Sequence, residues 1–205
     1  IQLVAAMTLL SIAPGILVTV TSFTRLVIVL SLLRTALGTQ QSPPNIVMIS
    51  LALFLTGFIM APTFEKAWQD GISPLIEERI DEFEAFERAV EPFRVFMLSQ
   101  VRDKDLQLFE DIGNVGAAEV GANAPLKVLV PAFMISELRR AFEIGFLIYL
   151  PFVIIDMVVA SILMSMGMMM VPPVIVSLPF KLIFFVLVDG WYLIAGSLVR
   201  SFGAS

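Results

Sequence analysis

Three ionisable side chains, Asp156, Lys181 and Asp189, lie inside the long apolar stretches of the second half of this sequence. A carboxylate in such surroundings either carries a proton or an ion, or pairs with a nearby cation. An unpaired charge in hydrocarbon costs about 3 kcal/mol or more, so partners are expected. We favour a structural or gating pair between Asp156 and Lys181. A proton relay normally needs a chain of carboxylates or histidines, and only Asp189 is otherwise present.

The separation of Asp156 and Lys181 depends on a turn between two expected helices, the first ending near Met166 and the next beginning near Val174. At a rise of ~1.5 Å per residue, Asp156 lies ~15 Å before this turn and Lys181 ~10 Å after it, a gap that the two side chains can span. The spacing leaves open whether they pair within one hairpin or between neighbouring copies of the chain.

The turn itself, residues 164–173, reads MSMGMMMVPP and holds five of the eleven methionines. Its glycine and two prolines exclude a regular helix. Methionine is flexible and polarizable, so several of them can fill an irregular gap and re-form around a passing chain. If copies of the chain surrounded an axis, these loops would close it with an apolar plug; otherwise they are core or lipid-facing methionines at a hairpin turn. The candidate gate-loop residues are Met166, Gly167, Met168, Met169, Met170, Pro172 and Pro173.

A second group of charges in apolar surroundings is interpreted as buried charges that serve assembly. Helical spacing allows Glu137 to pair with Arg140 (i,i+3) and Arg139 with Glu143 (i,i+4). An ion network at the level of a membrane interface explains this cluster equally well. The whole group is Arg25, Glu137, Arg139, Arg140, Glu143 and Asp189.

The composition of the 205-residue chain, 58% apolar and 15% charged, favours contact with lipid or a very large buried interface. Cysteine and histidine are absent, which removes thiol nucleophiles, thiolate or imidazole metal sites and the usual general base near neutral pH. The sequence contains neither a glycine-rich phosphate loop after a strand nor a Gly-x-Ser-x-Gly elbow. We therefore predict that the protein is not an enzyme, with no catalytic residues, metal or cofactor.

The net charge of −5 is unevenly distributed and divides the chain into three parts. Residues 65–127 carry 14 acidic and 7 basic side chains, a net of −7, and are expected to form a water-facing helical insert on the outer side of the membrane. Residues 1–64 and 128–205 are expected to form apolar helical hairpins, the second containing the gate loop at 164–173. No basic patch is present that would bind nucleic acid. The predicted fold class is all-α and membrane-associated, with four long apolar segments broken by prolines.

Glycine, serine and proline residues predict where the helices begin and end. Gly38 is expected just past the end of a first helix, while Ser42-Pro43 and Ser73-Pro74 are expected to start the next two. The uncharged segment from Ile46 to Phe64 is long enough to cross ~30 Å of hydrocarbon. The insert is expected to hold one helix over Ile76–Val90, two shorter ones around Phe93–Met97 and Leu106–Ile112, and a linker over Gly113–Asn123.

Prolines recur in the second half, where each tends to kink or end a helix. In lipid such breaks persist where neighbouring protein satisfies the freed carbonyls, so they favour packing against protein. Arg34 places the first turn on the cytoplasmic side. The chain starts at Ile1 without a basic n-region, which suits a mature protein whose signal peptide has been removed. The prolines concerned are Pro131, Pro151, Pro172, Pro173 and Pro179.

Five stretches of this sequence, in this order, strongly resemble the FliP family of the flagellar type III export gate, which is related to the injectisome SctR family. The resemblance covers nearly the whole chain and is weakest over residues 64–93 and 112–124. The stretches are TSFTRLVIVLSLLRTALGTQQSPPN, LALFLTGFIMAP, FMLSQVRDKDLQLF, PAFMISELRRAFEIGFLIYLPFVIIDMVVASILMSMGMMMVPP and SLPFKLIFFVLVDGWYLIAGSLVRSF.

The resemblance implies a homopentamer that assembles with FliQ and FliR into a cone-like gate for unfolded flagellar proteins. The gate belongs to the flagellar basal body at the bacterial inner membrane, and much of it lies on the periplasmic side. The family's methionine loop matches Met168, Met169 and Met170, and its buried acid and base match Asp156 and Lys181. The alternative is a small ion-coupled membrane transporter that works as a monomer or dimer and uses Asp156 and Asp189 as ion carriers.

Overall fold

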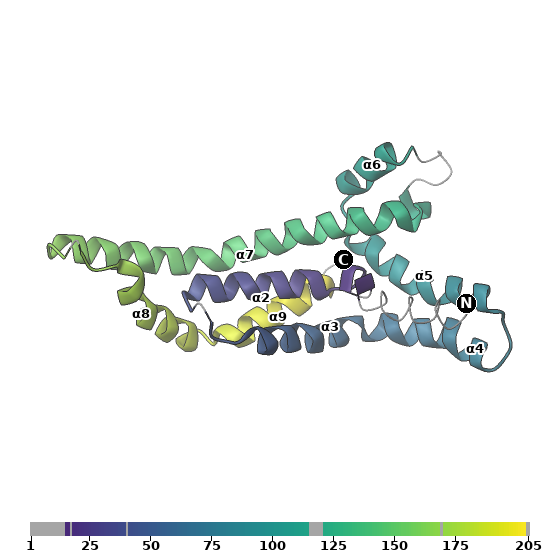
Figure 1. Cartoon of the computed structure of the whole chain (residues 1–205), viewed down its shortest axis with the longest axis horizontal. Coiled ribbons are helices and arrows are strands. Elements are labelled where there is room, and N and C mark those ends of the chain that lie inside the picture. Colours follow the sequence, from purple (N-terminus) through teal and green to yellow (C-terminus); the bar gives the residue numbers. More distant parts are fainter. Residues whose placement is uncertain (1–14, 17, 40, 115–120, 169, 204–205) are drawn as a thin grey trace, which may run out of the picture. The chain divides into compact units, whose positions relative to one another are not determined.

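The computed structural model describes residues 15–16, 18–39, 41–114, 121–168 and 170–203, and all regular structure within these residues is helical (Figure 1). The predicted all-α fold class is therefore confirmed. The chain divides into two compact units. Unit 1 comprises the described parts of residues 1–24 and 56–139, and unit 2 comprises residues 25–55 and the described parts of 140–204.

Unit 1 is built around a core between α5 (Glu82–Gln100), α6 (Asp103–Ile112) and the first turns of α7 (Leu126–Ser165). On α7, Leu129 and Phe133 are spaced by one helical turn, so both side chains reach the same buried face. Phe133 meets Phe96 of α5 edge to face, with ring centroids 5.9 Å apart. The 3₁₀ turn η3 (Gly121–Asn123) precedes α7. The core residues are Val20, Met97, Leu106, Ala124, Val128, Leu129, Ala132 and Phe133.

The prediction that Ser73-Pro74 begins the insert helix is wrong. α3 (Asn45–Ala67) continues directly into a π-helical turn, η1 (Trp68–Ile72), and then into α4 (Ser73–Ile76). Pro74 lies at the junction of η1 and α4, where the continuing helix loses one backbone hydrogen bond without ending. The residue that caps α5 is Asp81, whose carboxylate accepts from the Glu84 amide at 2.8 Å. α5 then includes Phe93–Met97, predicted as a separate helix, and runs through Pro92. The helix predicted at Leu106–Ile112 is confirmed as α6.

Unit 2 is a helical cluster in which α8 (Pro173–Leu187) leads back from the end of α7 and is followed by α9 (Gly190–Gly203) (Figure 1). Its core brings α2 (Phe23–Leu37), α7 and α8 together. α2 and α7 approach closely at Gly145, where an added Cβ would lie 2.2 Å from Leu32 Cδ1. The core residues are Leu33, Ala36, Leu37, Phe152 and Phe185.

Of the helix ends predicted around α2, the end at Gly38 is confirmed and the start at Ser42-Pro43 is not. Gly38 follows the last helical residue with φ +77°, as predicted, because glycine adopts the left-handed conformation without a Cβ penalty. The first helix does not run unbroken to this point, because a turn at residues 20–22 precedes α2. The prediction that Ser42-Pro43 begins the next helix is wrong: α3 begins at Asn45, whose amide oxygen accepts from Arg34.

Two helical stretches are long and apolar enough to cross a membrane, Asn45–Ile76 and Leu126–Ser165, among the residues that the structure describes. The pair α8 and α9 counts as a third if it is taken as one span, although the two helices are bent by 64°. α7 continues through Pro131 and Pro151 over its full 40 residues, whereas Pro172 and Pro173 do separate α7 from α8. A single interior proline removes one hydrogen bond, and a long helix absorbs this loss without ending.

Candidate functional site

The methionine turn is fixed to the end of α7 by backbone hydrogen bonds. The amide of Met168 donates to the Leu163 carbonyl, and that of Gly167 donates to the Met164 carbonyl, both at 3.0 Å. With Gly167 at φ +75°, these two bonds form a Schellman motif, which satisfies carbonyls that the helix end would otherwise leave free. α8 then starts with Pro173 at its first position, where a missing N–H has no cost.

This turn exposes methionine side chains on the surface of the single chain. Met166 is 66% exposed, Met168 is 44% exposed and Met170 is 98% exposed. Met169 lies outside the described residues. Met166 and Met168 also line a wholly apolar cavity of about 530 Å³ between α7 and α8, together with Leu163 and Phe180. The turn therefore offers a soft apolar surface without any charged atom.

Asp156 and Lys181 form an ion pair within one chain, with Lys181 Nζ 2.6 Å from Asp156 Oδ2. Lys181 is 3% exposed, whereas the side chain of Asp156 is 28% exposed. The helix ends needed for this pairing agree with those expected, since α7 ends at Ser165 and α8 begins at Pro173. Within the single chain, the two groups therefore meet inside one hairpin.

Two further groups bind this ion pair, the Ala36 carbonyl and the Ser177 hydroxyl, and sequence reasoning missed both. We call the four residues Ala36, Asp156, Ser177 and Lys181 the node. The Lys181 ammonium donates to the Ala36 carbonyl at 3.2 Å. Ala36 is one of the last four residues of α2, whose carbonyls have no partner within the helix, so the cation also satisfies the helix end and its dipole. The Ser177 hydroxyl donates to Asp156 Oδ1, and Ser177 is fully buried.

The positions of these groups follow from helical spacing. Ser177, Lys181 and Phe185 are four residues apart and are the buried residues of α8. On α7, Phe152 and Asp156 have the same spacing, and Phe152 packs against Phe185 in the unit 2 core. The serine could have been found as the polar neighbour one turn before Lys181. A backbone carbonyl has no sequence signature, so Ala36 could not.

Arg25 is the most completely buried basic side chain of the predicted set, at 1% exposure. Its Nη1 donates to the hydroxyl of Ser201 at 3.0 Å and to the Ser201 carbonyl at 3.2 Å. The guanidinium carbon lies 3.7 Å from the ring centroid of Phe202, which is the geometry of a cation–π contact. Arg25 therefore ties α2 to the last turns of α9.

The other members of the predicted buried group differ in how exposed they are in the single chain. Glu137 is fully buried, and Arg140 is half-buried. Arg139, Glu143 and Asp189 are exposed, so their predicted burial does not hold within one chain. Asp189 has φ +52° at the bend between α8 and α9, which places it outside both helices. Burial was predicted because these residues lie in apolar helical segments. A helix that faces solvent or a partner on one side nevertheless exposes, in the single chain, residues spaced about one turn apart on that side.

A polar network in unit 1 also escaped sequence reasoning. Asp105 is buried, accepts two hydrogen bonds from the Arg102 guanidinium at 2.7 and 2.8 Å, and accepts from the Ser136 hydroxyl at 2.6 Å. Burial raises the pKa of Asp105, but the hydrogen bonds from Ser136 and Arg102, with the positive charges of Arg102 and Arg139, outweigh it and leave the pKa below its ordinary value. This network joins α6 to α7.

Because the folded pKa of Asp105 is lowered, its contribution to stability is complete above the ordinary aspartate range and is lost as the pH falls through the lowered value. Asp105→Asn is expected to destabilise the protein by about 2 kcal/mol at pH 7, where a charged hydrogen-bond partner is lost. The difference between wild type and variant should shrink towards pH 3. Thermal unfolding followed by circular dichroism at both pH values measures this, with the exposed Asp103→Asn as the control. An equal difference at both pH values would contradict the assignment.

In unit 2, an ion pair and hydrogen bonds hold helices together. Among the described residues, no group of three or more carboxylate, histidine or cysteine side chains could hold a metal ion. The two charged side chains of the node, Asp156 and Lys181, pair with each other. Together with the Ala36 carbonyl, this pair forms a clamp that joins α2, α7 and α8. The methionine turn lies at the end of the two helices that this clamp joins.

Comparison with known proteins matches residues 6–198 to the FliP family. The chain is 62% identical over 202 residues to the flagellar biosynthetic protein FliP of Caulobacter vibrioides, covering 98% of this chain and 76% of that protein. It is 58% identical to the corresponding protein of Rhizobium meliloti, with 96% and 81% covered. The Bacillus subtilis protein of the same name is 56% identical, with 98% and 91% covered.

Proposed function

This chain belongs to the FliP family, and on that premise we propose that it is a core subunit of the flagellar type III protein export gate. In this proposal, five copies assemble with FliQ and FliR in the inner membrane, at the flagellar basal body. Unfolded flagellar proteins pass through the channel that they enclose. The relatives' names refer to flagellar biosynthesis, and the two apolar spans are consistent with a membrane location.

The observation that carries the channel proposal is the methionine turn. A flexible apolar side chain that is almost wholly exposed, such as Met170, needs a partner surface, and here the turn is held rigidly at its base by the Schellman motif and the two prolines. Copies of this turn around one axis would face each other with thioether side chains. Such a constriction excludes water and ions while closed and deforms around a passing chain.

The node formed by Ala36, Asp156, Ser177 and Lys181 has a supporting role in this proposal. It fixes α8 against α7 and against the end of α2, so that the turn between α7 and α8 keeps its orientation. The transporter alternative is less well supported. It requires carboxylates that exchange an ion along a path, yet Asp156 is already engaged by Lys181 and Ser177, and Asp189 lies exposed at a bend.

Convergence of the loops is tested by a disulfide cross-link, which is unusually clean here because the chain contains no cysteine. In the assembly purified with its partner subunits, Met170→Cys is expected to give disulfide-linked dimers under mild oxidation, since Cα atoms must come within about 7 Å of each other. The matched control is Phe54→Cys, which replaces another highly exposed apolar side chain, on α3. No cross-link at 170, or equal cross-linking at both positions, would contradict a shared axis.

A further inference from the structure

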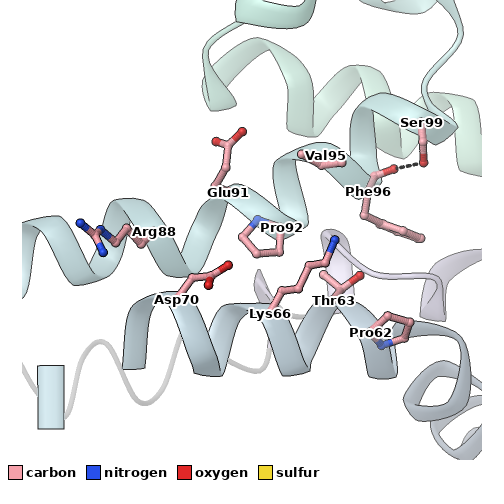
Figure 2. A pocket seen from close by; sticks show the side chains of 10 residues that line it. All are labelled: Pro62, Thr63, Lys66, Asp70, Arg88, Glu91, Pro92, Val95, Phe96 and Ser99. Carbon is pink, nitrogen blue, oxygen red and sulfur yellow. Dashed lines mark hydrogen bonds between the residues drawn. The ribbon is translucent and has the colours of Figure 1, made fainter. Parts of the chain in front are cut away.

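A groove of about 400 Å³ lies in unit 1, between the last turns of α3 with η1 and the facing side of α5 (Figure 2), whereas the node and the methionine turn belong to unit 2. Its residues on α5 recur at intervals of three and four, so one face of that helix forms one wall. The lining residues are Pro62, Thr63, Lys66, Asp70, Arg88, Glu91, Pro92, Val95, Phe96 and Ser99.

α3–η1 and α5 contact each other at two places, and the residues of neither contact line the groove. At Gly71 an added Cβ would lie 2.7 Å from the backbone nitrogen of Ala89, so the two backbones meet there. Phe64 and Phe93 also pack edge to face, with centroids 5.5 Å apart, yet neither lines the groove. The apolar part of the lining, which we call the floor of the groove, consists of the side chains of Pro62, Pro92, Val95 and Phe96 (Figure 2).

The charged groups of the groove are not equally available to a ligand. Arg88 is paired with Glu84 one turn away on α5. In Figure 2 the ammonium of Lys66 and the carboxylate of Asp70 lie at separate places along the α3–η1 wall. They are four residues apart and exposed, and no ion pair or hydrogen bond joins either of them to another described residue. Asp70 lies within η1, and π-helical turns are frequent at functional sites.

We propose that this groove is a docking site for an amphipathic helix of a partner protein. The α5 wall runs from Arg88 to Ser99, ~16 Å of helix, which matches two to three turns of a bound helix. An apolar seam of that helix rests on Pro62, Pro92 and Val95, in the manner of a helix bound in a groove between two others. One acidic and one basic side chain beside the seam, one turn apart, meet Lys66 and Asp70 respectively. The mixed lining argues against a lipid acyl chain, and the site is independent of the export-gate proposal.

The test is binding of a synthetic helical peptide to the full chain in nanodiscs, measured by fluorescence anisotropy. The peptide, about 18 residues long so that it forms several turns, carries leucines on one face and one Glu and one Lys beside that face, four residues apart. Changing the peptide Glu to Gln is expected to weaken binding to the wild-type chain about two- to fivefold, and to have no effect on binding to Lys66→Gln. Changing the peptide Lys to Gln should likewise weaken binding to the wild-type chain about two- to fivefold, and should have no effect on binding to Asp70→Asn.

Control variants on the same helices are Glu65→Gln and Glu87→Gln, which remove exposed charges outside the groove and should retain both effects. Empty nanodiscs give the background from partition of the peptide into lipid. Val95→Asn, at an exposed position of the floor, should weaken binding of every peptide. Absence of saturable binding above background overturns the proposal. So does an equal effect of the peptide substitutions on the wild-type chain and on the Lys66 and Asp70 variants.

Discussion

Replacing Met168, Met169 and Met170 together by alanine is expected to let small ions leak through the closed gate while the assembly stays intact. Each substitution removes most of a long apolar side chain, and the turn is held by backbone bonds that alanine retains. The resulting gap admits water, so we expect ion flux to rise about tenfold or more, as when a hydrophobic constriction is widened. Flux from dye-loaded liposomes that contain the purified assembly measures this effect.

The control for this experiment is Met157→Ala, because Met157 is 64% exposed on α7 but lies outside the turn. Its flux should equal that of the wild-type assembly. Leucine at all three turn positions should restore part of the seal, since leucine is apolar and of similar size but adopts fewer shapes. Unchanged flux in the triple alanine variant, with normal assembly, would show that the turn does not close the channel.

Asp156→Ala is expected to abolish assembly or export. It leaves the Lys181 ammonium buried beside Ala36 without its counterion, and removal of one partner of a buried pair costs about 3–5 kcal/mol. That cost is a large part of the total stability of a typical domain. The recovery of intact assembly after solubilisation, together with swimming of cells that express the variant, gives the two readouts.

Removing both charges separates the pair from the individual residues. Asp156→Leu combined with Lys181→Met leaves no bare charge, so assembly should recover even if export does not. Exchanging the two residues, Asp156→Lys with Lys181→Asp, tests direct contact, although the reversed cation loses the Ala36 carbonyl. If neither double variant assembles better than Asp156→Ala, the two side chains do not act as a pair.

Helix ends were predictable where a single residue determines the backbone, and not where several signals compete. Gly38 marked the end of α2 because only a left-handed residue fits there. Ser73-Pro74 carried an equally good start signal, but the segment from α3 onward stayed helical through η1, and Asp81 supplied the cap instead. A proline near a helix start is compatible with a new helix and with a continuing one, so the pattern alone could not distinguish them.

The node was predictable only in its charged members. Asp156 and Lys181 stand out because charges are rare in apolar sequence, and the rise per residue brought them within reach. Their neutral partner Ser177 and the Ala36 carbonyl depend on how three helices pack. The network of Asp105 with Ser136 was invisible for the same reason, since the two residues are 31 positions apart and belong to no local pattern.

The buried face of α8, with Ser177 and Lys181 on it, has a consequence for how the chain is made. A ribosome releases α8 after α7, and alone in the lipid it would carry a bare ammonium. In the proposed membrane location, insertion of this segment is more favourable when Asp156 of the preceding helix enters with it, so the two helices are expected to insert as one unit. A nascent chain whose synthesis stops between the two helices would hold Asp156 without its partner Lys181.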